Sequence, residues 1–347
     1  MRYVPIIKVE VGMVLGQDIY DGEGKVLFGK GNILQQEDAQ ELLNMGLPGV
    51  YVEDSYSEGV RVIPLISETL KQEALRLVYD LLDEERCQEI EQDYILEITR
   101  RITREISAGK DKLYNMIDTR SLDDYTFFHS VNVAVLATML GIASGNLDLE
   151  ELNMLTTCAL LHDVGRRYVE ANVLNAKRTL SEEERILVEQ HPKLGYDFLT
   201  EHYDFAPEVE KGVLEHHEWY NGCGYPMRRS GYDISYYARI IKVADVFDAL
   251  TSKLPYHDPV SPSGAMDYML ANAGVEFDPD LVELLDKKIA IYPVGCEVAL
   301  SDGRNAIVIE NNQESMLRPK VRTLPDGEII DLNQEEAKDL MVQELFV

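Results

Sequence analysis

The spacing of apolar residues divides the chain into four regions. Residues 1–62 contain short apolar stretches between turn residues, which predicts a small α+β domain with one helix over 35–46. Residues 63–112 contain little glycine or proline and repeat their apolar positions at helical spacing, which predicts connecting helices. Residues 113–288 are helical by the same criterion, and 289–347 returns to strands with hairpin turns. The predicted fold class is therefore mainly α, a helical bundle with a small α+β N-terminal domain and a small β C-terminal appendage.

The helical pattern within 66–112 leaves two interpretations open. Its apolar residues recur in a heptad-like pattern, which would allow two copies of the chain to pair as a homodimer. The same pattern fits a solvated helix that only links the flanking regions.

The region 113–288 contains all seven histidines of the chain. His129 falls on one predicted helix face with Val133, Leu136 and Leu140, at spacings i, i+4, i+7 and i+11. Its side chain is therefore expected to point into the core. Taken alone, such a histidine is more often a packed core residue than a ligand.

Two further histidine positions lie at predicted helix ends. His162 and Asp163 end an apolar helix for which Gly165 is the expected C-terminal cap. His216 and His217 follow an apolar helical stripe and precede a glycine-rich turn. An imidazole beside a carboxylate at a helix end offers nitrogen and oxygen ligands that can bridge two cations.

His191 lies on a predicted helix that opens at Ser181, where Glu184 completes a capping box. Leu187 and His191 are expected to share one face of this helix. Pro192 directly after the histidine disfavours helical geometry there and predicts a kink.

Two carboxylates complete the inward-facing polar set. Asp245 and Asp248 lie on the buried-looking face of an apolar helix, and a buried carboxylate needs a cation or hydrogen-bond donors. Five histidines and this aspartate pair on separate helices predict a binuclear transition-metal site in a helical bundle. His202 and His257 lie outside the pattern and are expected at the surface.

The composition limits the partners of the protein. Its 347 residues include 33 Lys and Arg against 62 Asp and Glu, a formal net charge of −29. Such a chain lacks the basic face that a nucleic-acid polymer requires, and it is repelled by an anionic membrane surface. The four cysteines are dispersed and no apolar run approaches a membrane span, so we expect a cytoplasmic protein. A small anionic ligand would need bound metal ions to reverse the local field.

Several motifs in a fixed order resemble the HD-GYP family, the bacterial metal-dependent phosphodiesterases of the HD superfamily that act on cyclic di-GMP. The motifs are His129, His162-Asp163-Val164-Gly165, His191-Pro192, His216-His217-Glu218, Gly222-Cys223-Gly224-Tyr225-Pro226 and Ala244-Asp245-Val246-Phe247-Asp248. The similarity covers about 113–288, and the tail also resembles a small β appendage that follows some of these domains.

The resemblance implies a ligand set for two divalent metals. The implied ligands are His129, His162, Asp163, His191, His216, His217 and Asp245. Asp163 would bridge the metals, with His129, His162 and Asp245 on one metal and the remaining three histidines on the other. Some members hold a third metal through a glutamate that is Tyr125 here, so two metals are expected. Iron or manganese is implied, with nickel, zinc or magnesium as alternatives.

The implied reaction is hydrolysis of cyclic di-GMP to pGpG, with GMP as a further product that the residues leave open. A hydroxide bridging the two metals would attack the phosphorus. Asp163 and Arg166 are the expected catalytic residues. The expected substrate-binding residues are Arg166, Gly222, Gly224, Tyr225, Pro226 and Lys253.

The sequence departs from the family pattern near the substrate. Arg166 replaces a lysine, so it can stabilise charge but cannot release a proton. Leu254 and His257 stand where the family has an arginine and a lysine for the dinucleotide, and Asn221 replaces an aspartate. Two alternatives therefore stay open: hydrolysis of another cyclic or linear dinucleotide, and a catalytically silent sensor or scaffold that keeps the metals.

Overall fold

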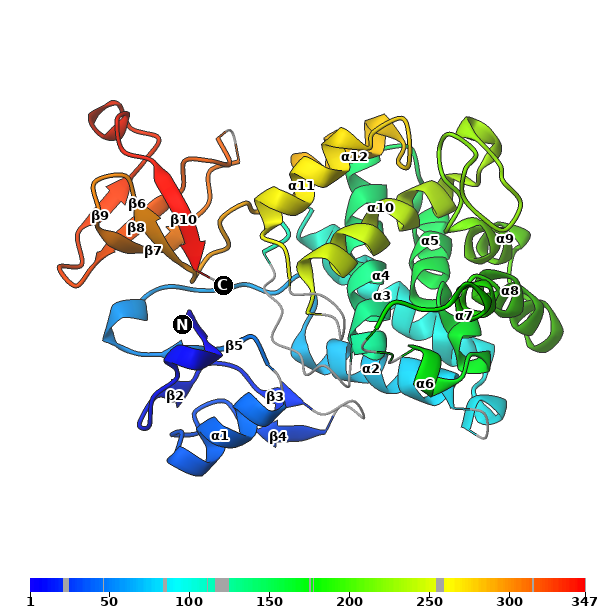
Figure 1. The fold of residues 1–347 in the computed structure, drawn as a ribbon, viewed down its shortest axis with the longest axis horizontal. Helices are drawn as coiled ribbons and strands as arrows, with labels where there is room; N and C mark the ends of the chain where they lie inside the picture. The colour runs from blue at the N-terminus through cyan, green and yellow to red at the C-terminus, as the bar shows by residue number, and fades with distance from the viewer. Residues whose placement is uncertain are drawn as a thin grey trace.

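The computed structural model describes residues 1–20, 25–45, 47–83, 86–110, 112–115, 125–174, 176, 178–253, 259–313 and 315–346. The helices gather on one side of the molecule, and the two small β-containing parts lie together on the other side (Figure 1). This arrangement confirms the predicted fold class.

The N-terminal part is built from short strands and one helix, as predicted. Its elements are β1 Arg2–Pro5, β2 Val14–Leu15, β3 Ile19–Tyr20, β4 Val26–Phe28, α1 Gln36–Asn44 and β5 Gly49–Glu53. Strands β1, β5 and β2 form an antiparallel sheet, and β3 pairs with β4 as a hairpin whose turn lies outside the described residues. Gly46, the last residue of the predicted helix over 35–46, also lies outside them.

The C-terminal part is a five-stranded antiparallel sheet. Its strands are β6 Glu297–Leu300, β7 Asn305–Glu310, β8 Lys320–Leu324, β9 Ile329–Asp331 and β10 Val342–Phe346, in the order β10-β6-β7-β8-β9. The two predicted hairpins are present, because β6 pairs with β7 and β8 pairs with β9.

The helical part contains the residues of interest for chemistry. Its helices are α2 Glu68–Leu82, α3 Gln92–Ala108, α4 Tyr125–Ser144, α5 Leu149–Leu161, α6 Ala171–Leu174, α7 Glu182–Val188, α8 His191–His202, α9 Pro207–Glu215, α10 Tyr236–Thr251, α11 Pro262–Ala271 and α12 Pro279–Asp286. A short 3-10 helix, η4 Val164–Tyr168, follows α5.

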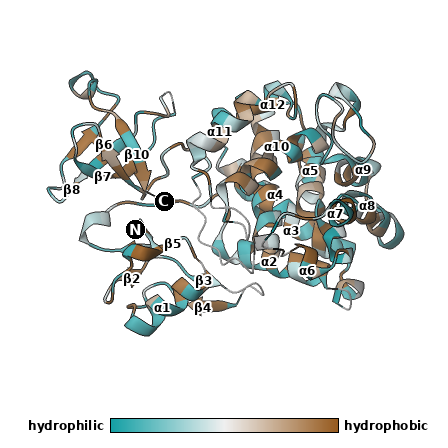
Figure 2. Ribbon diagram, in the orientation of Figure 1, coloured by the Kyte–Doolittle hydropathy of each residue, from teal (hydrophilic) through white to brown (hydrophobic). Residues whose placement is uncertain are grey.

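Helix α4 is the centre of the core. It packs against α2, α3, α5, α10 and α12, and the predicted inward stripe of Val133, Leu136 and Leu140 is fully buried. Figure 2 colours the ribbon of each helix, α4 included, by the hydropathy of its residues. Thr126–Ser144 is the one stretch of the described chain that is long and apolar enough to cross a membrane, and 78% of it is buried inside the protein. The apolar character of α4 is therefore explained by its central position.

Helices α2 and α3 direct their apolar faces toward this core. Ile95, Ile98 and Ile102 of α3 are fully buried and belong to the same hydrophobic cluster as α4 and α5. Threonine hydroxyls add polar contacts, with Thr99 Oγ1 lying 2.9 Å from Thr157 Oγ1 between α3 and α5. The two helices are thus packed onto the bundle rather than solvated along their whole length.

The N-terminal and C-terminal parts contact each other, and we refer to residues 1–62 and 295–346 together as the terminal lobe. The backbone N–H of Tyr3 donates to the carbonyl of Gly295 at 2.9 Å. Arg322 donates to the carbonyls of Tyr56 at 3.1 Å and Glu58 at 2.7 Å. Tyr3, Tyr51 and Cys296 form a small buried cluster between the parts.

Two local predictions were wrong. Gly165 is not a C-terminal cap, since it lies inside η4 without a positive φ. A Cβ atom there would lie 2.0 Å from the carbonyl oxygen of His191, so a glycine is required for close packing of η4 on α8. Leu187 does not share a face with His191, because α7 ends at Val188 and Leu187 is 51% exposed.

The capping box is present as predicted, and the interruption expected near Pro192 falls just before His191, which is itself the first residue of α8. Pro192 occupies the first turn of α8, where a backbone N–H would have no partner in the helix, so its absence costs nothing. The helical conformation is interrupted between α7, which ends at Val188, and α8, which begins at His191. At the start of α7 the hydroxyl of Ser181 accepts from the N–H of Glu184, and the carboxylate of Glu184 accepts from the N–H of Ser181. His202 is exposed at the end of α8, as expected.

Candidate metal centre

The structure brings all seven predicted ligands to one place inside the helical part. His129 is on α4 and Asp245 on α10, while the other five lie at helix ends: His162 and Asp163 after α5, His191 at the start of α8, and His216 and His217 after α9. Two groups have ligand atoms within 4.8 Å of one another. One is His129, His162 and Asp163, and the other is Asp163, His191, His216 and His217.

Asp163 belongs to both groups, and its two oxygens face different histidines. Oδ1 lies 3.2 Å from Nε2 of His191 and 3.9 Å from Nε2 of His216. Oδ2 lies 3.4 Å from Nε2 of His162 and 3.8 Å from Nε2 of His129. One carboxylate thus separates two sets of imidazoles, which is the arrangement expected of a bridging ligand.

Asp245 approaches the same centre from α10. Its Oδ1 lies 3.0 Å from Nε2 of His129, and its Oδ2 lies 4.0 Å from Nδ1 of His217. The histidines and both aspartates are nearly inaccessible to solvent, with His217 the most exposed at 14% of its side chain.

Three of the imidazoles are oriented by backbone carbonyls at helix ends. Nδ1 of His162 lies 2.7 Å from the carbonyl oxygen of Ala159, and Nδ1 of His191 lies 2.7 Å from that of Val188. Nδ1 of His216 lies 2.6 Å from the carbonyl oxygen of Val213. The last carbonyls of a helix have no partner in the helix itself, so each accepts the Nδ1–H of a histidine three residues later. This contact leaves the Nε2 lone pair directed at Asp163, as a metal ligand requires.

The electrostatics favour a neutral His216 and a neutral His217 beside an ionised Asp163. Burial, followed by repulsion from the neighbouring imidazoles, lowers the pKa of both His216 and His217 well below the usual value. Burial opposes ionisation of Asp163, but the nearby Arg166 and His162 outweigh it and hold the pKa of this carboxyl well below its usual range.

The pKa values of Asp245 and His129 are shifted in opposite directions. Burial opposes the charge of Asp245, yet hydrogen bonding to His129 lowers the pKa of this carboxyl well below its usual value. In His129 burial lowers the pKa, and the carboxylates of Asp245 and Asp248 overcome it, raising the pKa to about 9. A divalent cation and this proton would therefore compete for the same imidazole.

The donor set fits divalent transition metals. Within the described residues, the buried Nε2 of His162 and the buried Oδ2 of Asp163 lack a hydrogen bond of good geometry. Unpaired buried groups of this kind are costly unless a cation binds them. Imidazole nitrogens combined with carboxylate oxygens are typical ligands of iron, manganese, nickel and zinc.

The glycine-rich loop lies against the second group of histidines. Gly222 has a φ of +83°, and a Cβ atom on Gly224 would lie 2.2 Å from the backbone nitrogen of Trp219, so neither position favours a side chain. The ring of Tyr225, which precedes Pro226, stacks on His217 at 4.8 Å between centroids. Burial raises the pKa of Tyr225, so its hydroxyl stays protonated at neutral pH.

A buried carboxylate anchors this loop. Glu218 is 2% exposed and accepts from the backbone N–H of Met227 at 2.6 Å and of Arg229 at 3.0 Å. The loop is therefore held by its own backbone close to His217.

Of the remaining predicted site residues, Arg166 contacts Asp163 directly. Nε of Arg166 lies 2.8 Å from Oδ1 of Asp163, and its side chain is 21% exposed. Lys253 is half-buried just after the end of α10. Leu254 and His257 lie outside the described residues, as does the side chain of Tyr125.

Three further residues lie next to the centre: Asp248, which the sequence placed on the inward face without a separate role, and Lys242 and Glu276, which it did not predict. Asp248 Oδ2 lies 2.8 Å from Nδ1 of His129, and the signal for it was its position three residues after Asp245 on a buried face. Lys242 and Glu276 form a buried ion pair at 2.7 Å, with Lys242 one turn before Asp245 on α10. No sequence pattern links Glu276 to this position, since it comes from the segment between α11 and α12.

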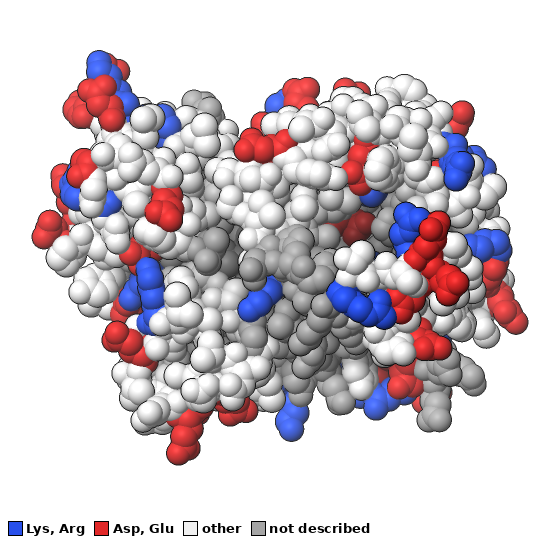
Figure 3. Space-filling model, in the orientation of Figure 1, with Lys and Arg blue, Asp and Glu red and all other residues white. Residues whose placement is uncertain are grey.

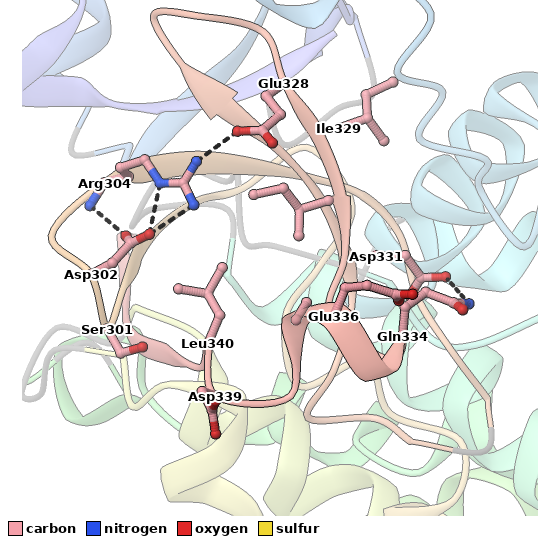
Figure 4. A pocket seen from close by; sticks show the side chains of 12 residues that line it. Ser301, Asp302, Arg304, Glu328, Ile329, Asp331, Gln334, Glu336, Asp339 and Leu340 are labelled. Atoms are coloured by element: carbon pink, nitrogen blue, oxygen red, sulfur yellow. Dashed lines mark hydrogen bonds and ion pairs between the residues drawn. The ribbon is translucent and has the colours of Figure 1, made fainter.

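A pocket away from the histidines lies at the C-terminal sheet (Figure 4). It has a volume of about 630 Å³ and is lined mainly by polar residues. Arg304 on its wall pairs with Asp302 at 2.7 Å and with Glu328 at 2.8 Å. Because these charged groups already satisfy one another, we assign no ligand to this pocket.

Charged side chains of both signs lie on one face of the protein (Figure 3). On the face shown in Figure 3, Lys and Arg side chains are interspersed with Asp and Glu side chains. The basic side chains described on this face therefore do not join into an extended area.

Comparison with known proteins identifies the helical part. Residues 113–281 match the family model of the HD domain, and residues 7–54 match that of a domain of unknown function. Residues 113–281 are thus an HD domain. The relatives described next confirm the resemblance to the HD-GYP family.

Curated relatives are phosphodiesterases of cyclic dinucleotides. A cyclic di-GMP phosphodiesterase of Pseudomonas aeruginosa is 34% identical over 66% of this chain and 54% of its own length. The cyclic di-GMP phosphodiesterase response regulator RpfG of Xanthomonas campestris is 32% identical over 63% of this chain and 54% of its own. A 3'3'-cGAMP-specific phosphodiesterase of Vibrio cholerae is 34% identical over 53% of this chain and 36% of its own. The chain spans about half the length of the first two.

One solved structure shares the fold over most of the chain. Bd1817, an HDG"Y"P protein from Bdellovibrio bacteriovorus, matches with a TM-score of 0.50 and 16% identity. The match covers 82% of this chain and 98% of that protein.

Proposed function

We propose that this chain is a metal-dependent phosphodiesterase that hydrolyses cyclic di-GMP. The observation that carries the proposal is the position of Asp163, whose two oxygens each face a separate set of buried histidines. The activities of the three relatives support a cyclic dinucleotide as the substrate class.

The proposed ligands are those expected from the sequence. His129, His162 and Asp245 would hold one metal, His191, His216 and His217 the other, and Asp163 would contact both. Two divalent metals in these positions supply Lewis acidity and a water molecule that is acidic enough to be a nucleophile at neutral pH.

The residues of the chain have separate roles in this proposal. The buried walls exclude bulk water from Asp163 and its neighbours, which strengthens every charge interaction there. Arg166 places a permanent positive charge at the edge of the site, where the phosphate of a substrate would carry negative charge. Gly222, Gly224, Tyr225 and Pro226 would shape the rim beside His217, and Lys253 would contribute a second positive charge.

The choice of dinucleotide rests on fewer observations. Leu254 and His257 replace two basic residues of the family, and one relative acts on 3'3'-cGAMP rather than cyclic di-GMP. We propose cyclic di-GMP, with pGpG as the first product and GMP as a possible second product of the same site. Another cyclic or linear dinucleotide is the alternative.

The test combines metal analysis with product chromatography. The full chain is purified with and without oxygen, its metals are counted, and cyclic di-GMP, 3'3'-cGAMP and pGpG are offered separately. We expect about two metals per chain, iron or manganese, and turnover of cyclic di-GMP. Turnover of another nucleotide alone would replace the substrate, and two metals without any turnover would favour the sensor or scaffold alternative. A fully active protein without metal would contradict the proposal.

The apolar helices bear on location and assembly. We propose a cytoplasmic protein, since the one helix among the described residues that is long and apolar enough to cross a membrane lies in the core. A homodimer through 66–112 would have to use the outer faces of α2 and α3, because their apolar faces pack on the bundle. A monomeric mass in light scattering would exclude it.

A further inference from the structure

His129 differs from the other oriented histidines in its position along a helix. His162, His191 and His216 each use a carbonyl that a helix end leaves without a partner. His129 lies within α4, where the backbone carbonyls are engaged by the helix itself. Its Nδ1 therefore needs an acceptor from another element.

Asp248 of α10 supplies that acceptor. Its Oδ2 lies 2.8 Å from Nδ1 of His129, and its Oδ1 accepts from Nδ2 of Asn132 at 2.8 Å. The hydroxyl of Ser252 lies 3.5 Å from Oδ2. Asp248 is 2% exposed, so the carboxylate that orients His129 is itself held at both oxygens inside the protein.

The charges around the two histidine groups are unequal. Near His129 there are three carboxylates, at 2.8 Å for Asp248, 3.0 Å for Asp245 and 3.8 Å for Asp163. The other group combines three histidines with Asp163 as its closest carboxylate, and the Nδ1 atoms of His191 and His216 face neutral carbonyls. A carboxylate behind a ligand histidine raises the basicity of that ligand more than a carbonyl does.

We propose that Asp248 is a positioning residue that fixes His129 with Nε2 directed at the centre, and thereby makes the metal position of His129 the tighter of the two. This inference rests on the proposed function, since it requires two metals bound by the ligands named above. Metal binding would then be stepwise, with the position of His191, His216 and His217 filled last and emptied first.

The test measures metal affinity rather than catalysis. The full chain is stripped of metal and titrated with Mn²⁺ against a calibrated chelator, which gives two dissociation constants. In Asp248→Asn the tighter constant is expected to weaken about 10- to 100-fold, while the weaker constant changes by less than about threefold. The amide keeps the size of the carboxylate but loses its charge and cannot accept from both His129 and Asn132.

Asp278→Asn is the matched control. Asp278 is a buried aspartate that pairs with Arg239 of α10 and caps α12 through the N–H of Asp280. Its replacement is expected to lower the melting temperature while leaving both metal constants unchanged. A role of Asp248 in folding alone would make the two variants behave alike.

Three outcomes overturn the inference while leaving the proposed function standing. They are an unchanged tighter constant in Asp248→Asn, an equal weakening of both constants, and equal affinities in the unmodified protein. A protein that binds no metal at all would instead contradict the proposed function. If Asp248→Asn does not fold, Asn132→Ala frees one oxygen of Asp248 and is expected to weaken the tighter constant about threefold. No change in that variant would also overturn the inference.

Discussion

A histidine becomes a ligand through what its second ring nitrogen contacts. Nε2 of His162, His191 and His216 faces Asp163 because Nδ1 of each is held by a carbonyl three residues earlier. The same local geometry recurs on three helices, so it follows from helix termination rather than from special residues around each histidine.

Asp163→Asn tests the shared carboxylate. The substitution keeps the shape but removes the negative charge between two sets of imidazoles, so both metals should be lost or weakened at least 100-fold. Metal analysis after dialysis measures this. Circular dichroism of the metal-free forms is the control, and both metals retained at full affinity would contradict a shared role for Asp163.

Arg166 permits a graded test of charge. Arg166→Lys keeps a cation near the site and should retain turnover within about tenfold, while Arg166→Gln removes it and should lower kcat about 100-fold. Steady-state rates on the preferred nucleotide, with metal content matched between variants, measure the difference. Equal rates in the two variants would show that the charge of Arg166 is not used.

At the scale of elements, the site depends on how closely helix ends approach. Gly165 in η4 contacts the backbone of α8 directly. Helix η4 comes directly after Asp163, and α8 begins with His191. A side chain at this contact would separate the two ligand-bearing segments.

Gly165→Ala should therefore destabilise the helical part and weaken metal binding together. The added Cβ would lie 2.0 Å from the carbonyl oxygen of His191, and overpacking of this kind costs about 2–3 kcal/mol. Thermal unfolding with and without Mn²⁺ measures both effects. Gly29→Ala is the control, because its Cβ would meet its nearest atom, in Asn32, at an ordinary 3.6 Å. Unfolding at the same temperature as the unmodified protein would refute the steric argument.

Helical periodicity in the sequence was sufficient for the strongest features of the site. His129 lies on the face that its apolar neighbours indicated, and the capping box of Ser181 and Glu184 is present. Periodicity failed where a helix stops, since the break between α7 and α8 places Leu187 in solvent. The roles of Gly165 and Glu276 could not be predicted, because both depend on contacts between elements that are distant in sequence.

At the scale of the whole molecule, the two ends of the described chain meet in the terminal lobe (Figure 1). In sequence, the HD domain lies between these two ends. Arg322 links the parts of this lobe through carbonyls of Tyr56 and Glu58. The metal centre lies in the helical part and shares no residue with that contact.

Arg322→Ala should loosen the terminal lobe without affecting the metals. It removes two charge-assisted hydrogen bonds, each at an exposed position, so a loss of about 1–2 kcal/mol is expected. Hydrogen exchange should accelerate in β5 and β6, with unchanged metal content. Arg304→Ala is the control, because Arg304 pairs only within the C-terminal part in the contacts described above. Equal protection of β5 and β6 in both variants would argue that Arg322 does not join the two parts.

The terminal lobe is built from two segments that are far apart in sequence, and this has a consequence for biosynthesis. The contact between Glu58 and Arg322 joins residues 264 positions apart, so it cannot form until Arg322 has left the ribosome. At about 5–20 residues per second, the roughly 230 residues between the halves of the lobe take about 10–50 s to synthesise. During that interval the buried faces of Tyr3 and Tyr51 are exposed on the nascent chain, where a chaperone or a premature partner strand would meet them. The helical domain has time to fold first, and closure of the lobe becomes a late step in maturation.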